Sequence, residues 1–400
     1  MRLRLLLVAL LSAGAAGTAR AQRATVPVIT LDKGAVEVPD PFSQLAGVIE
    51  LRDGRVLALD MKEKELRLVD LKSGDVAPVS RLGGGPLEYQ VPGILIRGAA
   101  DTAAYYDLTQ RRLLLFSPNG VPLRTVAYGT NAMAMLSMMQ PAWADAAGRL
   151  YGVTLGMNIG QPNAPTAPTF SDSVEIQSFD VRTGKVESLA RVRSTTAAAK
   201  PKMDMGPSGV KMSLTASDFS SGDTWTVLPD GKVAILRDGV YRVHFVATGR
   251  PDMLGPAVAH TPVPVTPSDR RAILDSVRKA VEEGLKPARQ AAAQAGRGGA
   301  AMSIEAEVLE PERWATTKPP YASLAASPDA YLWVGQLGAY GDKSARFDVL
   351  TSSGSLQARV VLAAGETLIG LGRGVVFTIR TDADDLQYLR RYALPAPLAR

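Results

Sequence analysis

Between residues 47 and 75 the chain alternates short apolar segments with polar turns, and this pattern predicts one four-stranded antiparallel unit. Val48 to Leu51 is apolar throughout, as expected of a strand buried on both faces. Asp53-Gly54 predicts a tight hairpin, because a type I′ turn needs residues that accept a positive φ. Apolar character then fades toward Asp75 to Val79, the expected outer strand. This gradient is typical of a β-propeller blade, whose inner strand lines the crowded axis.

Weaker copies of the unit recur to the C-terminus and predict six blades within one domain, residues 22–400. The sixth blade has only three strands before the chain ends, whereas Pro27 to Val38 is strand-like and precedes the first blade. We therefore expect this N-terminal strand to pair with the last blade, which removes an exposed edge. The predicted fold is an all-β, six-bladed β-propeller closed by the N-terminal strand. The predicted blades begin near Phe42, Ile94, Pro141, Thr224, Tyr321 and Thr367.

Two segments interrupt the repeat. Ser194 to Asp218 is polar and is expected to be a long surface loop. Residues 265–316 are expected to form a helix and linker insertion between blades four and five. Thr266-Pro267-Ser268-Asp269 has a helix-capping threonine, a proline at the first position and an acid at the third. Apolar residues at helical spacing follow.

The predicted helix covers residues 267–286, because Pro287 disturbs the pattern and 291–301 resembles a mobile Ala/Gly linker. We expect the apolar stripe of this helix to pack on a face of the propeller. The alternatives are a lid over the central channel and a docking helix for a partner.

The N-terminus has the features of a secretory signal. Arg2 and Arg4 provide positive charge, and the apolar segment from Leu5 to Ala16 is short for a membrane span. The small residues around position 20 predict cleavage between Ala21 and Gln22, so residues 1–21 are the expected signal peptide. The mature chain is then exported, to the periplasm or the extracellular space, with no transmembrane segment.

Charge and composition narrow the possible partners. The formal net charge is +6, and removal of the three signal arginines leaves +3, which is too small to favour nucleic acid or an anionic membrane. No cysteine is present, which excludes disulfides and cysteine nucleophiles. The two histidines, His244 and His260, cannot supply a three-histidine zinc site. No nucleophile-elbow motif is found, so the sequence predicts no catalytic residue. Separately, we expect the protein to be a monomer.

The candidate binding residues lie in loops that share one end of the predicted ring. These loops join successive blades, or join the second and third strands of a blade. The basic residues among them suit a ligand with a carboxylate or phosphate group. The loop from Gly83 to Tyr89 is either an anion cradle made of backbone N–H groups or a tight turn capped by Glu88. The candidates are Asp60, Glu88, Tyr89, Asp107, Arg237 and Lys318.

Four short stretches carry a resemblance to a known family. The chain resembles the secreted six-bladed β-propeller proteins of bacteria, related to the NHL and TolB-like propellers. The resemblance implies the propeller fold and a helical insertion at the observed place, but it implies no particular activity. The stretches are Gly83-Gly84-Gly85-Pro86-Leu87-Glu88-Tyr89, Lys318-Pro319-Pro320, Leu332-Trp333-Val334, and Phe347-Asp348-Val349 with Ser353-Gly354.

Three functions follow as hypotheses. The first is an exported binding or scaffold protein that holds a small polar ligand or a protein on one propeller face, with no cofactor. The second is a calcium-dependent lactonase or ester hydrolase, because Asp60, Glu88 and Asp107 could converge on a calcium ion, as the acids of propeller lactonases do. Acids at strand ends are also common turn formers. The third is a partner-docking protein that acts through the inserted helix.

Overall fold

The computed structural model describes residues 26–127, 140–154, 157–158, 169–193, 202–206, 209–220, 222–237, 239–295 and 303–399. The predicted signal peptide, with its cleavage point between Ala21 and Gln22, lies outside these residues. Within them, no helix is long and apolar enough to cross a membrane.

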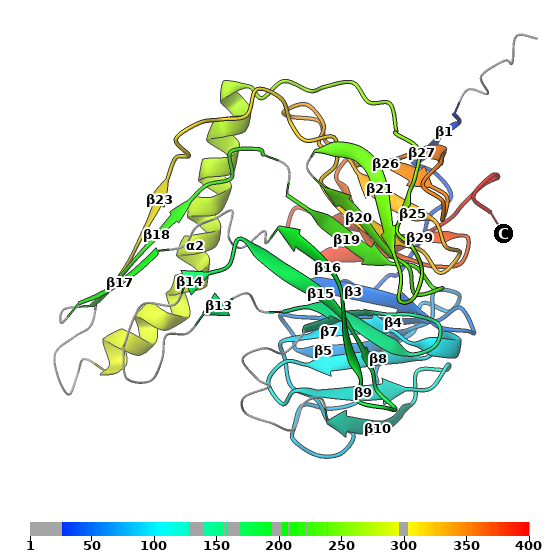
Figure 1. Ribbon diagram of the computed structural model, residues 1–400. Coiled ribbons are helices and arrows are strands. Elements are labelled where there is room, and N and C mark those ends of the chain that lie inside the picture. Colours follow the sequence, from blue (N-terminus) through cyan, green and yellow to red (C-terminus); the bar gives the residue numbers. More distant parts are fainter. Residues whose placement is uncertain are drawn as a thin grey trace, which may run out of the picture.

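The protein is a six-bladed β-propeller, built from six sheets in which the strands of each blade are antiparallel (Figure 1). Blade one is β3 (Leu45–Glu50), β4 (Val56–Asp60), β5 (Glu65–Val69) and β6 (Val76–Pro78). Blade two is β7 (Gly93–Arg97), β8 (Ala103–Asp107), β9 (Arg112–Phe116) and β10 (Pro122–Ala127). Blade three is β11 (Gln140–Ala144), β12 (Arg149–Val153), β15 (Ser173–Asp180) and β16 (Val186–Arg193).

The other three blades follow the same order from inner to outer strand. Blade four is β19 (Thr224–Val227), β20 (Val233–Arg237), β21 (Val240–Val246) and β22 (Met253–Leu254). Blade five is β24 (Ser323–Ala326), β25 (Leu332–Gly335), β26 (Arg346–Leu350) and β27 (Leu356–Leu362). Blade six contributes β28 (Glu366–Leu371), β29 (Val375–Thr381) and β30 (Gln387–Ala393). The inner strands contact one another in sequence order, from β28 through β3, β7, β11 and β19 to β24.

Hydrophobic clusters between neighbouring blades form the core. Six such clusters are present among the described residues, one for each interface of the ring. Val56, Ala58 and Phe377, for example, pack between blades one and six. Every residue of β4 is buried, because both faces of a blade are covered by its neighbours. The continuous apolar runs of the inner strands follow from this arrangement.

The N-terminal segment closes the ring, as predicted, but it serves two blades. β2 (Val36–Glu37) pairs antiparallel with β30 and completes blade six. β1 (Val28–Leu31) instead pairs parallel with β27 as a fifth strand of blade five. The side chains of Ile29 and Leu31 are buried in the cluster between blades five and six. Gly34, at a φ of +75°, lies in the turn between the two strands, where a side chain would be strained.

A second, smaller unit projects from the ring, and we call it the arm (Figure 1). It contains the helix α2 (Pro267–Ala295) and a sheet of β17 (Lys202–Gly206), β18 (Gly209–Thr215) and β23 (Ser303–Leu309). The loop predicted for Ser194 to Asp218 is therefore wrong, since β17 and β18 lie within it. Val210, Met212 and Leu214 alternate with polar residues, which is the period of a strand. A small hairpin of β13 (Met157–Asn158) and β14 (Thr169–Phe170) lies nearby.

The helix begins as the sequence predicts and ends later. The Thr266 hydroxyl accepts a hydrogen bond from the Asp269 amide at 3.2 Å, and the Asp269 carboxylate accepts one from the Thr266 amide at 2.8 Å. This reciprocal capping box fixes the first turn. The helix then continues through Pro287 to Ala295 instead of ending near residue 286. It packs against β23 of the arm, which corrects the expectation that it packs on a propeller face.

Candidate functional site

The two ends of the ring differ in what they carry. The β17–β18 hairpin and α2 are inserted in connections between blades, and the β13–β14 hairpin lies between a second and a third strand. In antiparallel blades these connections lie at one end of the ring, which we call the arm end. All six predicted binding residues lie at the arm end, and the first-to-second hairpins of the blades lie at the opposite end.

Two of the predicted acids hold turns together. Asp60, at the end of β4, is fully buried, and its carboxylate accepts hydrogen bonds from the amides of Lys62 and Glu63 at 3.1 Å. It also accepts a hydrogen bond from the amide of Ser43, in the connection that enters blade one. Each carboxylate–amide bond pairs a backbone donor of these two connections.

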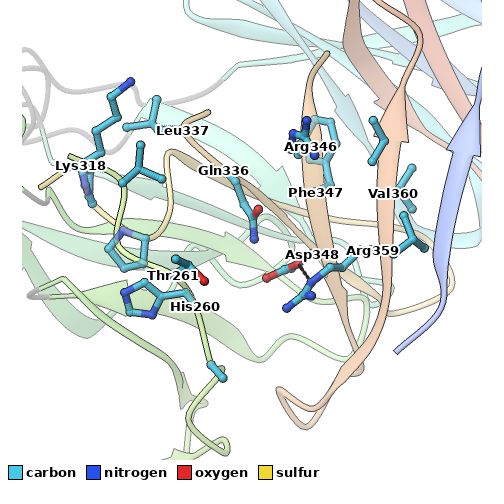
Figure 2. Close-up of a pocket in the computed structure, with 16 residues that line it drawn as sticks. His260, Thr261, Lys318, Gln336, Leu337, Arg346, Phe347, Asp348, Arg359 and Val360 are labelled. Carbon is cyan, nitrogen blue, oxygen red and sulfur yellow. Dashed lines mark hydrogen bonds and ion pairs between the residues drawn. The ribbon is translucent and has the colours of Figure 1, made fainter. Parts of the chain in front are cut away.

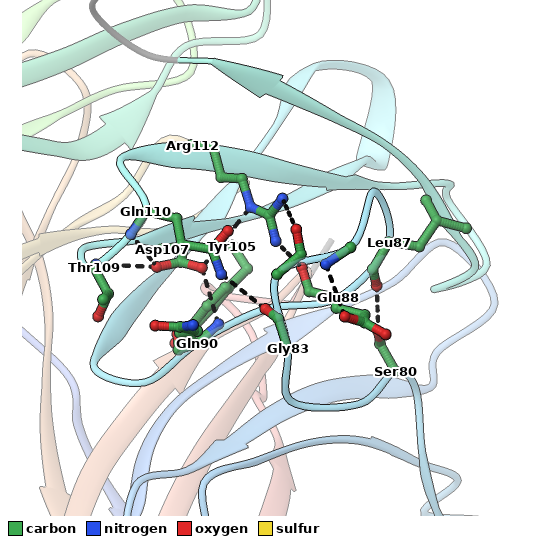
Figure 3. Close-up of polar contacts among 12 residues, drawn as sticks. Ser80, Gly83, Leu87, Glu88, Gln90, Tyr105, Asp107, Thr109, Gln110 and Arg112 are labelled. Atoms are coloured by element: carbon green, nitrogen blue, oxygen red, sulfur yellow. Dashed lines mark hydrogen bonds and ion pairs between the residues drawn. The ribbon is translucent and has the colours of Figure 1, made fainter.

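Asp107 repeats this arrangement at the end of β8. Its buried carboxylate accepts hydrogen bonds from the amides of Thr109 at 3.0 Å, Gln110 at 2.8 Å and Gln90 at 2.9 Å (Figure 3). The guanidinium of Arg112 lies 3.9 Å away. In both blades the acid thus joins the second-to-third turn to the incoming connection.

Glu88 closes the glycine loop upon itself. One carboxylate oxygen accepts a hydrogen bond from the Gly85 amide at 2.7 Å, and the other pairs with Arg81 at 2.6 Å. These two contacts, the Gly85 bond first, lower the pKa of Glu88. Nearby side chains bind the loop from outside, because Gln110 donates to the Gly83 carbonyl and Arg112 to the Glu88 carbonyl (Figure 3). The predicted alternative of a tight, Glu88-capped turn describes this geometry.

Tyr89 is a packing residue between blades one and two. It is 1% exposed, and its ring meets that of Tyr105 edge-on at 5.5 Å. Its hydroxyl accepts a hydrogen bond from the Leu66 amide at 2.8 Å and donates to the Lys64 carbonyl at 3.2 Å. Burial is the main cause of the raised pKa of Tyr89.

The two predicted basic residues lie on the other side of the ring. Arg237 belongs to blade four, and Lys318 precedes blade five. Arg237 ends β20, and its Nε atom has no hydrogen-bond partner among the described residues. Lys318 is buried, and its ammonium pairs with Asp269 in the first turn of α2 at 2.6 Å. The structure therefore links Glu88 and Asp107 through Arg112, packs Tyr89 beside them, and places Arg237 and Lys318 elsewhere. Among the described residues, no three acidic or histidine side chains gather as a metal site.

A cleft of about 560 Å³ opens at the arm end, between blade five and the segment that leads from blade four to the arm. Residues 259–263 form one wall, and β26, β27 and β1 form the other. In Figure 2 the side chains of Thr261, Gln336 and Arg359 lie across this space from one another, and His260 lies at its edge. Lys318 is the one predicted binding residue that lines it.

Asp348 is the buried acid of the cleft. Its side chain is 1% exposed, and its carboxylate accepts a hydrogen bond from the Tyr241 hydroxyl at 2.7 Å and from Arg359 Nε at 3.2 Å. Burial and the neighbouring Asp348 raise the pKa of Tyr241, so the phenol stays protonated and donates. The ring of Tyr241 meets that of His260 at 5.9 Å. These contacts fix the position of Arg359.

The basic residues of the cleft are not equally neutralised. Arg346 forms an ion pair with Asp342 at 3.1 Å, and Lys318 forms one with Asp269. Arg359 shares the carboxylate of Asp348 with Tyr241, and its side chain remains 45% exposed. Its guanidinium ends in the middle of the cleft (Figure 2). Within the described residues, the cleft therefore has more positive than negative lining groups and one guanidinium available to a ligand.

His260, Gln336, Asp348 and Arg359 were not among the predicted binding residues, although His260 and Asp348 appear in the sequence analysis for other reasons. The available signal was Asp348, an acid in the middle of the apolar strand Arg346–Leu350, because a charge buried in a strand requires a partner. That partner, Arg359, lies on the next strand, and the sequence alone gave no reason to select it.

Several solved structures are similar to this chain at low sequence identity. No protein-family model matches the sequence, and no curated protein matches it. A gluconolactonase of Xanthomonas campestris is 9% identical with a TM-score of 0.43, over 92% of this chain and 97% of that chain. A regucalcin of Agrobacterium tumefaciens is 13% identical with a TM-score of 0.37, over 94% and 99%. A streptogramin B lyase is 12% identical with a TM-score of 0.38, over 90% and 97%.

Proposed function

We propose that this protein is an exported binding protein whose cleft between blades four and five holds a small polar anion. The observation that carries the proposal is the guanidinium of Arg359, fixed on one side by Asp348 and open to the cleft on the other. A guanidinium forms charge-assisted, bidentate hydrogen bonds with a carboxylate or a phosphate. The anionic group of the ligand is therefore a carboxylate or a phosphate that pairs with Arg359, and the rest of the ligand is polar.

The neutral groups around Arg359 support a polar ligand. The Thr261 hydroxyl, the Gln336 amide and the His260 imidazole face the same space and offer both donors and acceptors (Figure 2). Ligand sites are typically concave, with a few polar groups that fix the orientation of the ligand. Asp348 makes the ring-side wall selective, since its carboxylate repels an anion placed away from Arg359.

Isothermal titration of the chain from Gln22 onward tests this function. The ligand set contains inorganic phosphate, citrate, sugar phosphates and sugar acids, together with neutral sugars and lactones, with and without calcium. We expect an anion to bind, and Arg359→Gln to weaken its binding by about tenfold or more, since a charge-assisted hydrogen bond contributes about 1.5–3 kcal/mol.

Arg124→Gln is the matched control. Arg124 is an exposed residue of β10 in blade two, and its replacement is expected to leave binding unchanged. If Arg359→Gln and Arg124→Gln bind the same anion equally, the cleft is not the site. A response to neutral lactones with calcium, in place of anions, would favour the hydrolase hypothesis.

Export is a separate part of the proposal. Its support is the N-terminal pattern of positive charge, a short apolar segment and small residues before Gln22. Expression in a bacterial host and N-terminal sequencing of the periplasmic fraction test it. A mature protein that begins at Gln22 is expected, and an uncleaved chain retained in the cytoplasm would contradict it.

The arm supports a second candidate, the docking of a protein partner. The arm is fixed to the ring at its root, while most side chains of α2 after Leu274 are exposed. A variant with residues 270–316 replaced by a short Gly/Ser linker is expected to lose a partner but to retain anion binding. Loss of anion binding alone would instead assign the arm a role in the cleft.

A further inference from the structure

A second cavity, of about 430 Å³, lies at the opposite end of the ring and is independent of the cleft. Its lining comes from blades two to six, which places it on the axis of the propeller. Leu95 and Arg97 come from β7, Trp143 from β11, Val227 from β19 and Arg373 from the first hairpin of blade six. None of these residues belongs to the predicted binding face.

Arg97 is a partly buried cation of β7 without an ion-pair partner among the described residues. Its guanidinium donates hydrogen bonds to the Glu50 carbonyl at 2.9 Å and to the Leu371 carbonyl at 3.3 Å. No carboxylate of the described residues lies within ion-pair distance. Burial lowers the pKa of Arg97, although Glu50 acts in the other direction. Buried charges are normally paired, so an anion in this cavity would supply the missing partner.

The other guanidinium of the cavity already has its carboxylate. Asp101 pairs with Arg373 and with Arg52, the latter at 3.4 Å. Asp101 and the preceding Ala100 both have a positive φ, of 65° and 50°. Such backbone is strained for residues other than glycine and is kept where the surrounding structure requires it. The strained turn thus neutralises Arg373 and leaves Arg97 as the unpaired cation.

An apolar wall completes the cavity. Leu95, Trp143 and Val227 line it beside the charged groups. The indole of Trp143 packs on that of Trp225, with ring centroids 4.3 Å apart, which holds it in place. An aromatic surface binds the flat apolar part of a ligand through area burial and ring contacts.

We propose that this axial cavity binds a small organic anion, a carboxylate carried on an aromatic or branched apolar body. The carboxylate pairs with Arg97, and the body packs on Leu95, Trp143 and Val227. The chemical class differs from the polar anion assigned to the cleft, because the cleft offers polar neutral groups where this cavity offers an apolar wall.

Phenylacetate and its neutral analogue phenylacetamide test the proposal on the full mature chain, by titration calorimetry and tryptophan fluorescence. We expect phenylacetate to bind with a change in fluorescence, and phenylacetamide to bind about tenfold more weakly or worse. Arg97→Gln is expected to abolish the difference between the two probes, and Trp143→Leu to weaken both.

Arg97→Lys keeps the positive charge and is the second variant to test if Arg97→Gln fails to fold. It is expected to retain the preference for phenylacetate over phenylacetamide. Arg359→Gln, in the distant cleft, is expected to leave phenylacetate binding unchanged, so this proposal and the proposed function fail separately. Equal binding of both probes, loss through Arg359→Gln, or no binding of phenylacetate at millimolar concentration would each overturn the proposal.

Discussion

The ammonium of Lys318 lies 2.6 Å from the carboxylate of Asp269, and both side chains are about 95% buried. Lys318 precedes blade five, and Asp269 is in the first turn of α2, so the pair joins the arm to the ring. The same ammonium donates a hydrogen bond to the Gly338 carbonyl at 2.6 Å. The arm therefore has a fixed root at the edge of the proposed anion cleft.

Removal of one partner of this pair should loosen the arm. Lys318→Met leaves the Asp269 carboxylate buried without a cation, which typically costs about 3–5 kcal/mol. We expect faster hydrogen exchange over residues 259–295 and 303–320 and a lower urea midpoint. Lys211→Met is the control, because its pair with Glu307 is more than half exposed and contributes less than about 1 kcal/mol. Equal effects of both variants would contradict the role of Lys318.

Closure of the ring should depend on pH through Glu37. Hydrogen bonds from Arg380 and Arg390 lower the pKa of Glu37 from 4.5 to about 2, against the opposing effect of burial. The folded-state pKa is lowered, so the stabilisation is complete above pH 4.5 and is lost as the pH falls toward 2. Because solvent screens charges at this partly exposed site, we expect ionised Glu37 to contribute roughly 1–2 kcal/mol to the free energy of unfolding.

Glu37→Gln measures this contribution. Its urea midpoint should lie below that of the original chain at neutral pH, and the two should converge on acidification toward about pH 2. A constant difference between them across this range would mean that the carboxylate charge does not hold β2 against β30.

Loss of the Tyr89 hydroxyl should destabilise the interface of blades one and two. Tyr89→Phe leaves the Leu66 amide without its acceptor and the Lys64 carbonyl without its donor. A buried unsatisfied group costs about 1–3 kcal/mol, which thermal unfolding can resolve. Tyr340→Phe, at a side chain that is 60% exposed, should have no measurable effect. An unchanged melting temperature for Tyr89→Phe would show that the hydroxyl is not needed.

Replacement of the proline within α2 should stabilise the arm. Pro287 is exposed and cannot donate its backbone hydrogen bond, and proline inside a helix is about 3 kcal/mol less favourable than alanine. Pro287→Ala is expected to raise helicity and slow hydrogen exchange in 280–295. Ala280→Pro, at an exposed position earlier in the same helix, should lower helicity and speed hydrogen exchange. Faster exchange in Pro287→Ala would indicate that the proline stabilises a needed bend.

Local pattern alone was enough for the blades and for the start of the helix. Asp53-Gly54 and its counterparts mark hairpins because turn geometry depends on a few neighbouring residues. The predicted N-cap Thr266 and the acid Asp269 form a capping box for the same reason, since both partners lie within one turn. Asp60 and Asp107 lie at one end of the ring, and backbone amides take up their carboxylates.

Contacts between distant parts of the chain were decided by the tertiary structure. β18 becomes a strand by pairing with β23, and β1 joins blade five by burying Ile29 and Leu31 against it. Arg97 becomes an unpaired cation only because five blades meet at the axis, and Arg359 becomes available only because Tyr241 shares its acid. Local sequence pattern was sufficient to predict the six-bladed repeat, its turns and the cap of the inserted helix. Where the arm packs and which charges remain unpaired depend on side chains far apart in the sequence, and local pattern carries no information about them.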